Sequence, residues 1–148
     1  MSMRTFLERM SRRRSFVRHL PANLGGLPII VSPDAQLKYL KPGPKGFDRT
    51  LLEAAVRLVR PGDNVWDVGA NVGVFSVAAA ALSLTGQIVA IEADIWLASL
   101  LSRTARLPAN AAYNITVLPV AAFSTAGVAS FAIAARGRAS SHLAGISG

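Results

Sequence analysis

The fold of this chain is decided by the stretch Val65-Trp66-Asp67-Val68-Gly69-Ala70-Asn71-Val72-Gly73. Residues 64–68 form a short apolar run that is typical of a central strand in a parallel sheet. A mostly apolar, alanine-rich helix is expected over residues 72–84. The two glycines lie between them, where the chain must turn sharply and the helix must start close to the strand. The stretch therefore predicts the first strand–turn–helix unit of an α/β domain.

The segments on both sides of this unit continue the same pattern. We expect a helix over 47–59 capped by Asp48, a strand over 87–91, a helix over 96–107, a strand over 115–120 and a further strand over 128–134. Strands that alternate with helices at this spacing predict a Rossmann-like, doubly wound parallel sheet with right-handed crossovers.

Composition limits the classes of protein that this chain can represent. With 148 residues, 51% of them hydrophobic, it has enough material for one domain with a packed core. Polar residues interrupt every apolar run before it reaches membrane-spanning length, and the start lacks the features of a secretory signal, so we expect a cytoplasmic protein. The chain has no cysteine and only two histidines, which predicts chemistry without a metal.

Positive charge is concentrated near the N-terminus. Residues 1–60 hold twelve of the sixteen Lys and Arg residues and four of the eight acidic ones, so this part carries the whole net charge of +8. Apolar spacing predicts a basic, weakly amphipathic helix over 3–20, followed by a connector over 21–46 that contains one hairpin. The basic helix has two interpretations, a surface that docks on phosphate or an anionic membrane, or a solvated extension.

The turn at residues 69–73 excludes two common phosphate-binding motifs. A dinucleotide fingerprint would need glycines at the positions of Asn71 and Val74, and no Lys-Ser or Lys-Thr pair closes the turn as in a P-loop. The glycines alone would also fit a plain βα turn of another α/β domain. Asp67 favours a ligand with an amine, because a carboxylate repels phosphate but accepts hydrogen bonds from an ammonium group.

Glu92 follows the second strand, at the same edge of the predicted sheet as Asp67. A carboxylate at this place can accept hydrogen bonds from both hydroxyls of a ribose. The alternative is an exposed loop acid. Asp94, two residues later, is interpreted as the N-cap of the next helix.

These residues resemble a known family. The stretch from Val65 to Gly73, followed by Val89-Ala90-Ile91-Glu92-Ala93, is similar to the FkbM-type class I S-adenosylmethionine-dependent methyltransferases, and the similarity extends from about Phe47 to Ala134. The resemblance implies that S-adenosylmethionine is the methyl donor. It places Asp67, Gly69, Ala70, Asn71 and Gly73 near the methionine portion, Glu92 on the ribose and Ala121 beside the adenine. It also implies transfer to an oxygen, the hydroxyl of a sugar or small metabolite.

The resemblance also predicts what lies outside this unit. We divide the chain into a basic helix and connector, 1–46, and an incomplete S-adenosylmethionine-binding domain, 47–148, whose sheet is truncated after the third or fourth strand. No catalytic base can be named; His142 is either that base or a loop histidine. Cofactor binding is therefore expected more firmly than methyl transfer, and the open sheet is expected to need a partner or a missing segment.

A second hypothesis comes from a different class of protein. The chain could be a non-catalytic basic module that contacts nucleic acid or an anionic membrane surface through residues 1–20, with the α/β part as scaffold. A methyltransferase that acts on RNA lies between the two hypotheses, whereas the family resemblance favours a small-molecule or glycan acceptor.

Overall fold

A parallel three-stranded sheet lies at the centre of the computed structural model, which describes residues 14–133 and 142–143. Its strands are β3 (Val65–Val68), β4 (Gln87–Ile91) and β5 (Asn114–Leu118), in that spatial order. The register pairs Val68 with Ile91 and Ile91 with Leu118, so all three strands end at the same edge. The prediction of an α/β chain with a parallel sheet is confirmed, and the arrangement is compatible with a Rossmann-like fold.

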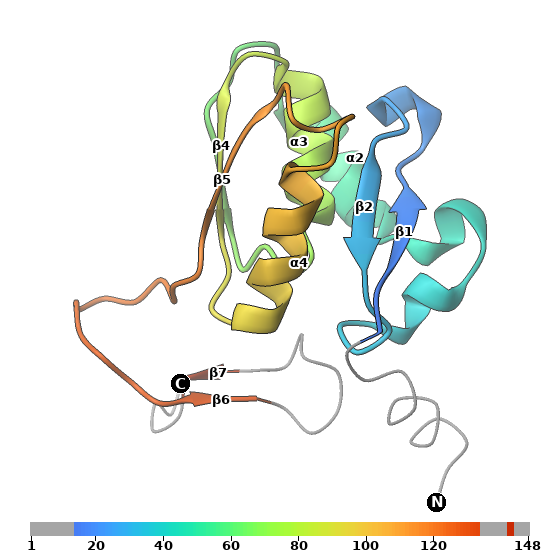
Figure 1. The fold of residues 1–148 in the computed structure, drawn as a ribbon. Coiled ribbons are helices and arrows are strands. Elements are labelled where there is room, and N and C mark those ends of the chain that lie inside the picture. The colour runs from blue at the N-terminus through green and yellow to red at the C-terminus, as the bar shows by residue number, and fades with distance from the viewer. Residues whose placement is uncertain (1–13, 134–141, 144–148) are drawn as a thin grey trace, which may run out of the picture.

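Two helices cover one face of the sheet (Figure 1). Helix α3 (Val74–Ser83) connects β3 to β4, and helix α4 (Ile95–Ala105) connects β4 to β5. Two right-handed crossovers that step in the same direction place both helices on the same side. Within the described residues no helix lies on the other face, where Trp66 and Val68 are 70% and 59% exposed. Helices on both faces, which a doubly wound sheet requires, are therefore not seen within the described residues, and that part of the prediction stays a prediction.

A further layer packs on the outer side of these helices. Helix α2 (Arg49–Leu58) packs against α3, and strand β2 (Pro28–Val31) packs against α4. Asp48 caps α2 as predicted, because its carboxylate accepts hydrogen bonds from the backbone N–H groups of Thr50 and Leu51 at 3.0 and 3.4 Å. Short 3-10 turns complete the layer: η1 (Ala22–Leu24), η2 (Leu37–Leu40) and η3 (Gly43–Gly46).

The helix predicted over residues 3–20 is wrong for its last part. Residues Phe16–His19 form strand β1, which pairs antiparallel with β2 from Phe16↔Val31 to His19↔Pro28. The hairpin therefore begins before the connector rather than inside it. Exposure alternates along β1, with Val17 and His19 turned outward, as a two-sided strand requires. Residues 1–13 lie outside the described part of the chain.

The hairpin shares its core with the helices that cover the sheet. Ile29 and Val31 are fully buried and belong to one cluster with Val77 and Leu100. Two side chains also tie the hairpin to α4 and the segment after it. The Ile30 N–H donates to Thr104 Oγ1 at 2.9 Å, and Asn110 Nδ2 donates to the Pro28 carbonyl at 2.8 Å. The N-terminal layer is thus part of the support of the sheet.

The predicted strand over 128–134 is reduced to β6 (Phe131–Ala132). It pairs antiparallel with β7 (His142–Leu143) in a separate two-stranded sheet, so it does not extend the central one. Among the helices of the described residues, none combines the length and apolar character that a membrane crossing demands.

Candidate functional site

The ends of β3 and β4 lie at one edge of the sheet, beside the turn that connects β3 to α3. Six of the seven predicted cofactor residues lie here: Asp67, Gly69, Ala70, Asn71, Gly73 and Glu92. The turn is fastened to the neighbouring strand, because the N–H groups of Gly69 and Ala70 both donate to the Ile91 carbonyl, at 2.9 and 3.0 Å. In open parallel α/β sheets this edge is where ligands bind.

Three residues of the turn have positive φ angles: Gly69 at 81°, Asn71 at 53° and Gly73 at 90°. The left-handed region costs a glycine little, and it costs asparagine less than other residues with a Cβ atom. The Asn71 side chain also accepts a hydrogen bond from the Val72 N–H at 2.7 Å. The residue types at these positions are thus explained by the sharp reversal from strand to helix.

Gly69 and Gly73 differ in the space that a side chain would have. A Cβ atom at Gly73 would lie 2.1 Å from Cδ1 of Leu101 in α4, whereas one at Gly69 would meet nothing within 4 Å. Gly73 therefore leaves room for the Leu101 side chain of α4 at the start of α3, a requirement that comes in addition to the predicted closeness of helix and strand. Gly69 stands beside open space and needs glycine only for its backbone angle.

Asp67 is half-buried at the end of β3, and its Oδ2 accepts a hydrogen bond from the Ser76 hydroxyl at 2.5 Å. Burial raises the pKa of the Asp67 carboxyl, and the hydrogen bonds from the Ser76 hydroxyl and backbone N–H offset this only in part. The site thus holds an acid at the N-terminus of α3. Sequence reasoning missed Ser76, although its place in the first turn of the helix after Asp67 was a usable signal.

Glu92 is buried and not the exposed loop acid of the alternative interpretation. Its Oε2 accepts the N–H of Asn71 at 2.7 Å, and its Oε1 accepts the N–H of Asp94 at 2.8 Å. The carboxylate is thus held between the two turns at this edge of the sheet. Asp94 caps α4 as predicted, with its Oδ1 accepting from the N–H groups of Trp96 and Leu97 at 2.9 and 3.4 Å.

A cavity of about 560 Å³ lies immediately after Glu92, between the start of α4 and β6. Its size is within the range of small-molecule sites. The lining is mostly apolar and includes two aromatic rings: Ala93, Asp94, Ile95, Trp96, Ser99, Phe131 and Ile133. This cavity could not be predicted from the sequence, because Phe131 and Ile133 approach α4 from more than thirty residues away.

Ala121 is the predicted site residue that stands apart from the rest. It is exposed in the segment that follows β5, where every residue from 118 to 130 is exposed. The last hydrogen bonds that fix this segment to the sheet are those of the Leu118 carbonyl with the N–H groups of Glu92 and Val120, at 3.0 and 2.9 Å. Its assignment to the adenine stays a prediction. The side chain of His142 lies outside the described part of the structure.

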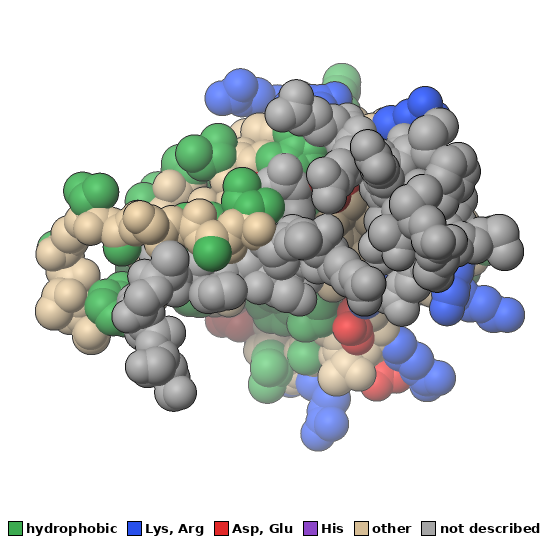
Figure 2. Space-filling model, turned by 90° about the horizontal axis from the view of Figure 1, so that it is seen from below, with side chains coloured by type: hydrophobic (Ala, Val, Ile, Leu, Met, Phe, Trp, Pro, Cys, Tyr) green, Lys and Arg blue, Asp and Glu red, His purple; other side chains and the backbone are tan. Residues whose placement is uncertain are grey.

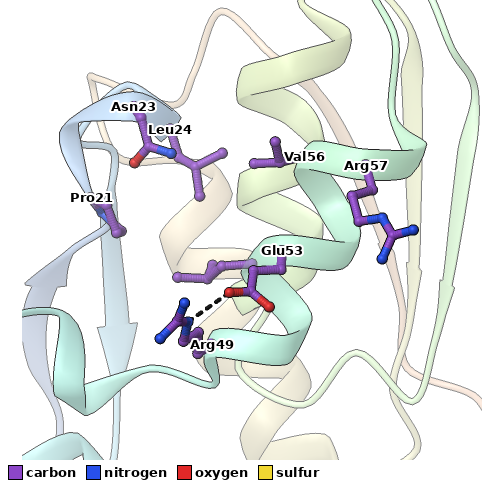
Figure 3. Close-up of a pocket in the computed structure, with 8 residues that line it drawn as sticks. Pro21, Asn23, Leu24, Arg49, Glu53, Val56 and Arg57 are labelled. Atoms are coloured by element: carbon purple, nitrogen blue, oxygen red, sulfur yellow. Dashed lines mark hydrogen bonds and ion pairs between the residues drawn. The ribbon is translucent and has the colours of Figure 1, made fainter.

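A second cavity, of about 300 Å³, lies between η1 and α2 (Figure 3). Pro21, Asn23 and Leu24 face Val56 and Glu53 across it, and the Arg57 side chain points away from them. The charges of Arg49 and Glu53 on the rim neutralise each other, since Arg49 Nε donates to Glu53 Oε1 at 2.6 Å. This cavity is a small apolar hollow away from the ends of the strands.

Positive charge does not gather into one patch among the described residues on the face shown in Figure 2. On the face shown in Figure 2, Lys and Arg side chains are spread around the rim, while hydrophobic ones gather toward one side. No group of three or more His, Cys, Asp or Glu residues with metal-ligand geometry occurs in the described part.

Comparison of the chain with known proteins adds no assignment to this geometry: no protein-family model matches it, and neither does any curated protein.

Proposed function

We propose that this chain binds S-adenosylmethionine as the cofactor unit of an FkbM-type methyltransferase, and that the methyl acceptor is the hydroxyl of a sugar or small metabolite. The observation that carries the proposal is the pair of carboxylates, Asp67 and Glu92, at adjacent strand ends on either side of a glycine turn that lacks a phosphate-binding motif. The two acids fit an amine and a ribose, both of which this cofactor contains.

The residues at this edge of the sheet fit the cofactor in three respects. Asp67 is half-buried, so its carboxylate can accept a charge-assisted hydrogen bond from an ammonium group at reduced solvent screening. Glu92 uses one hydrogen bond on each oxygen, and a carboxylate offers about four lone-pair sites, which leaves acceptors for a diol. The apolar cavity beside Glu92 is suited to a purine base.

When bound, the cofactor supplies a methyl group that its sulfonium charge already activates. The work of the protein is then to bind the donor, to orient it and to exclude water from it. Asp67 and the turn would hold the amino acid end, while Glu92 and the walls of the cavity would hold the nucleoside.

The test is calorimetric titration of the chain with S-adenosylhomocysteine. Wild type is expected to bind, and Asp67→Asn to weaken binding by about tenfold or more, because a charge-assisted hydrogen bond contributes about 1.5–3 kcal/mol. Glu53→Gln in α2 is the matched control, since it removes a carboxylate from an exposed ion pair that contributes little to stability. Circular dichroism of both variants verifies the fold.

The proposal is wrong if wild type binds neither S-adenosylhomocysteine nor S-adenosylmethionine while folded. Binding that is equal in wild type and in Asp67→Asn would overturn the assignment of the amine to Asp67. Salt-dependent binding to nucleic acid or anionic vesicles, with no cofactor binding, would instead favour the basic binding module.

A further inference from the structure

The Glu92 side chain connects the two turns at this edge of the sheet. One carboxylate oxygen accepts the N–H of Asn71, in the turn from β3 to α3, and the other accepts the N–H of Asp94, in the turn from β4 to α4. Both distances, 2.7 and 2.8 Å, are those of charge-assisted hydrogen bonds. Because Glu92 is buried, water competes little for these two donors.

The turn from β3 to α3 needs such an anchor in its outer half, residues 71–73. Its inner half is bound to the sheet through the N–H groups of Gly69 and Ala70, which share the Ile91 carbonyl. Beyond Ala70 the chain passes through Asn71, whose φ of 53° is unfavourable for a residue with a Cβ atom. Among the described contacts of this outer half, the bond from the Asn71 N–H to Glu92 is the one that reaches another strand end.

We infer that Glu92 is a positioning residue that couples the two turns, in addition to the contact with ribose that the proposed function gives it. The coupling rests on geometry that is independent of any ligand. The link to the ligand rests on the proposed function: a diol that binds to the remaining lone pairs of the carboxylate stabilises both turns at once.

The first test measures the coupling without ligand, by amide hydrogen exchange of wild type and Glu92→Gln. Glutamine preserves size and offers only one acceptor oxygen, so Asn71 and Asp94 cannot both keep their bonds. Exchange of at least one of these two amides is expected to rise about tenfold or more. The amides of Gly69 and Ala70 are the internal reference, because their acceptor is the Ile91 backbone.

Two results of this experiment overturn the coupling. One is unchanged exchange at both Asn71 and Asp94. The other is a rise of the same size at Gly69, Ala70 and the amides of the central strand β4, which would indicate general loss of stability. Glu53→Gln, with its exposed ion pair on α2, is the control and is expected to leave all four amides unchanged.

The second test separates the two roles through the ligand. Wild type and Glu92→Gln are titrated with S-adenosylhomocysteine and with an analogue whose ribose lacks both hydroxyls. We expect the substitution to weaken the binding of both ligands. The affinity for the analogue should fall because the turn is loosened, and the affinity for S-adenosylhomocysteine should fall further because the contact with the diol is also lost. If Glu92→Gln leaves the affinity for the analogue unchanged, Glu92 does not position the turns for ligand binding.

The two proposals fail separately. If neither ligand binds wild type, the proposed function is wrong, whereas the exchange experiment still decides whether Glu92 couples the turns.

Discussion

The two turns at the ends of β3 and β4 lead into helices of nearly equal length but start them in different ways. Helix α4 begins with Asp94, whose side chain caps its first N–H groups. Helix α3 begins with Gly73 at φ 90°, without a side-chain cap at that position in the described structure, after a turn with three positive φ angles. The turn from β4 to α4 is built as a stable helix start usually is. The turn from β3 to α3 departs from that pattern, which is a common sign of a functional segment.

The largest effect on stability is expected at Gly73, where the turn from β3 to α3 meets α4. Gly73→Ala combines a clash with Leu101 and a strained φ, and we expect a loss of about 3 kcal/mol in the free energy of unfolding. Gly69→Ala is the matched variant, since it has a similar φ and open space around the new Cβ atom, and should cost about 1–2 kcal/mol. Urea denaturation measures both values.

The explanation of Gly73 can be checked further with Leu101. If the clash accounts for the larger part of the loss in the free energy of unfolding, Leu101→Ala should lower that free energy less in the Gly73→Ala background than in wild type. Equal losses for alanine at positions 69 and 73 would contradict the packing explanation.

The capped turn is expected to give an intermediate effect. Asp94→Ala removes the acceptor for the Trp96 and Leu97 N–H groups and should lower the free energy of unfolding by about 1 kcal/mol. Asp94→Ser keeps an N-cap acceptor and should retain most of the stability. If serine is as destabilising as alanine, capping is not what Asp94 contributes.

The smallest effect on stability is expected at Asp67. Because burial raises its pKa, the folded protein holds the Asp67 proton more tightly than the unfolded chain does. The stability from this group is therefore complete below the unfolded pKa of about 3.9, and it declines as the pH rises through the folded pKa. Asp67→Asn removes this decline and leaves an oxygen that can accept from Ser76.

Thermal denaturation from pH 4 to pH 7 should therefore show Asp67→Asn equal to wild type or slightly more stable at neutral pH, with the advantage decreasing toward acid. Together with weaker binding of S-adenosylhomocysteine, this would distinguish Asp67 from Asp94, which is expected to matter for stability. A large loss of stability in Asp67→Asn at pH 7 would mean that the carboxylate serves the fold.

The sequence predicted those features that depend on near neighbours. The bounds of β4 agree with the predicted 87–91, and the caps at Asp48 and Asp94 are confirmed, because each depends on residues within one helical turn. The strand at 16–19 differs from the predicted helix because its partner, 28–31, lies inside the predicted connector and the apolar spacing imitates a helix. The environment of Glu92 was equally hidden, since it depends on a bond to Asn71, twenty-one residues earlier.

The sheet face on which no described helix lies has an optical consequence. The chain has two tryptophans, and they sit in unlike surroundings: Trp66 is largely exposed on that face, while Trp96 is partly buried at the start of α4 and lines the cavity beside Glu92. We therefore expect the emission of Trp66 to be red-shifted and readily quenched by a soluble quencher, and the emission of Trp96 to be blue-shifted and better protected. Without any label, fluorescence can report separately on a molecule that covers the sheet and on one that enters the cavity.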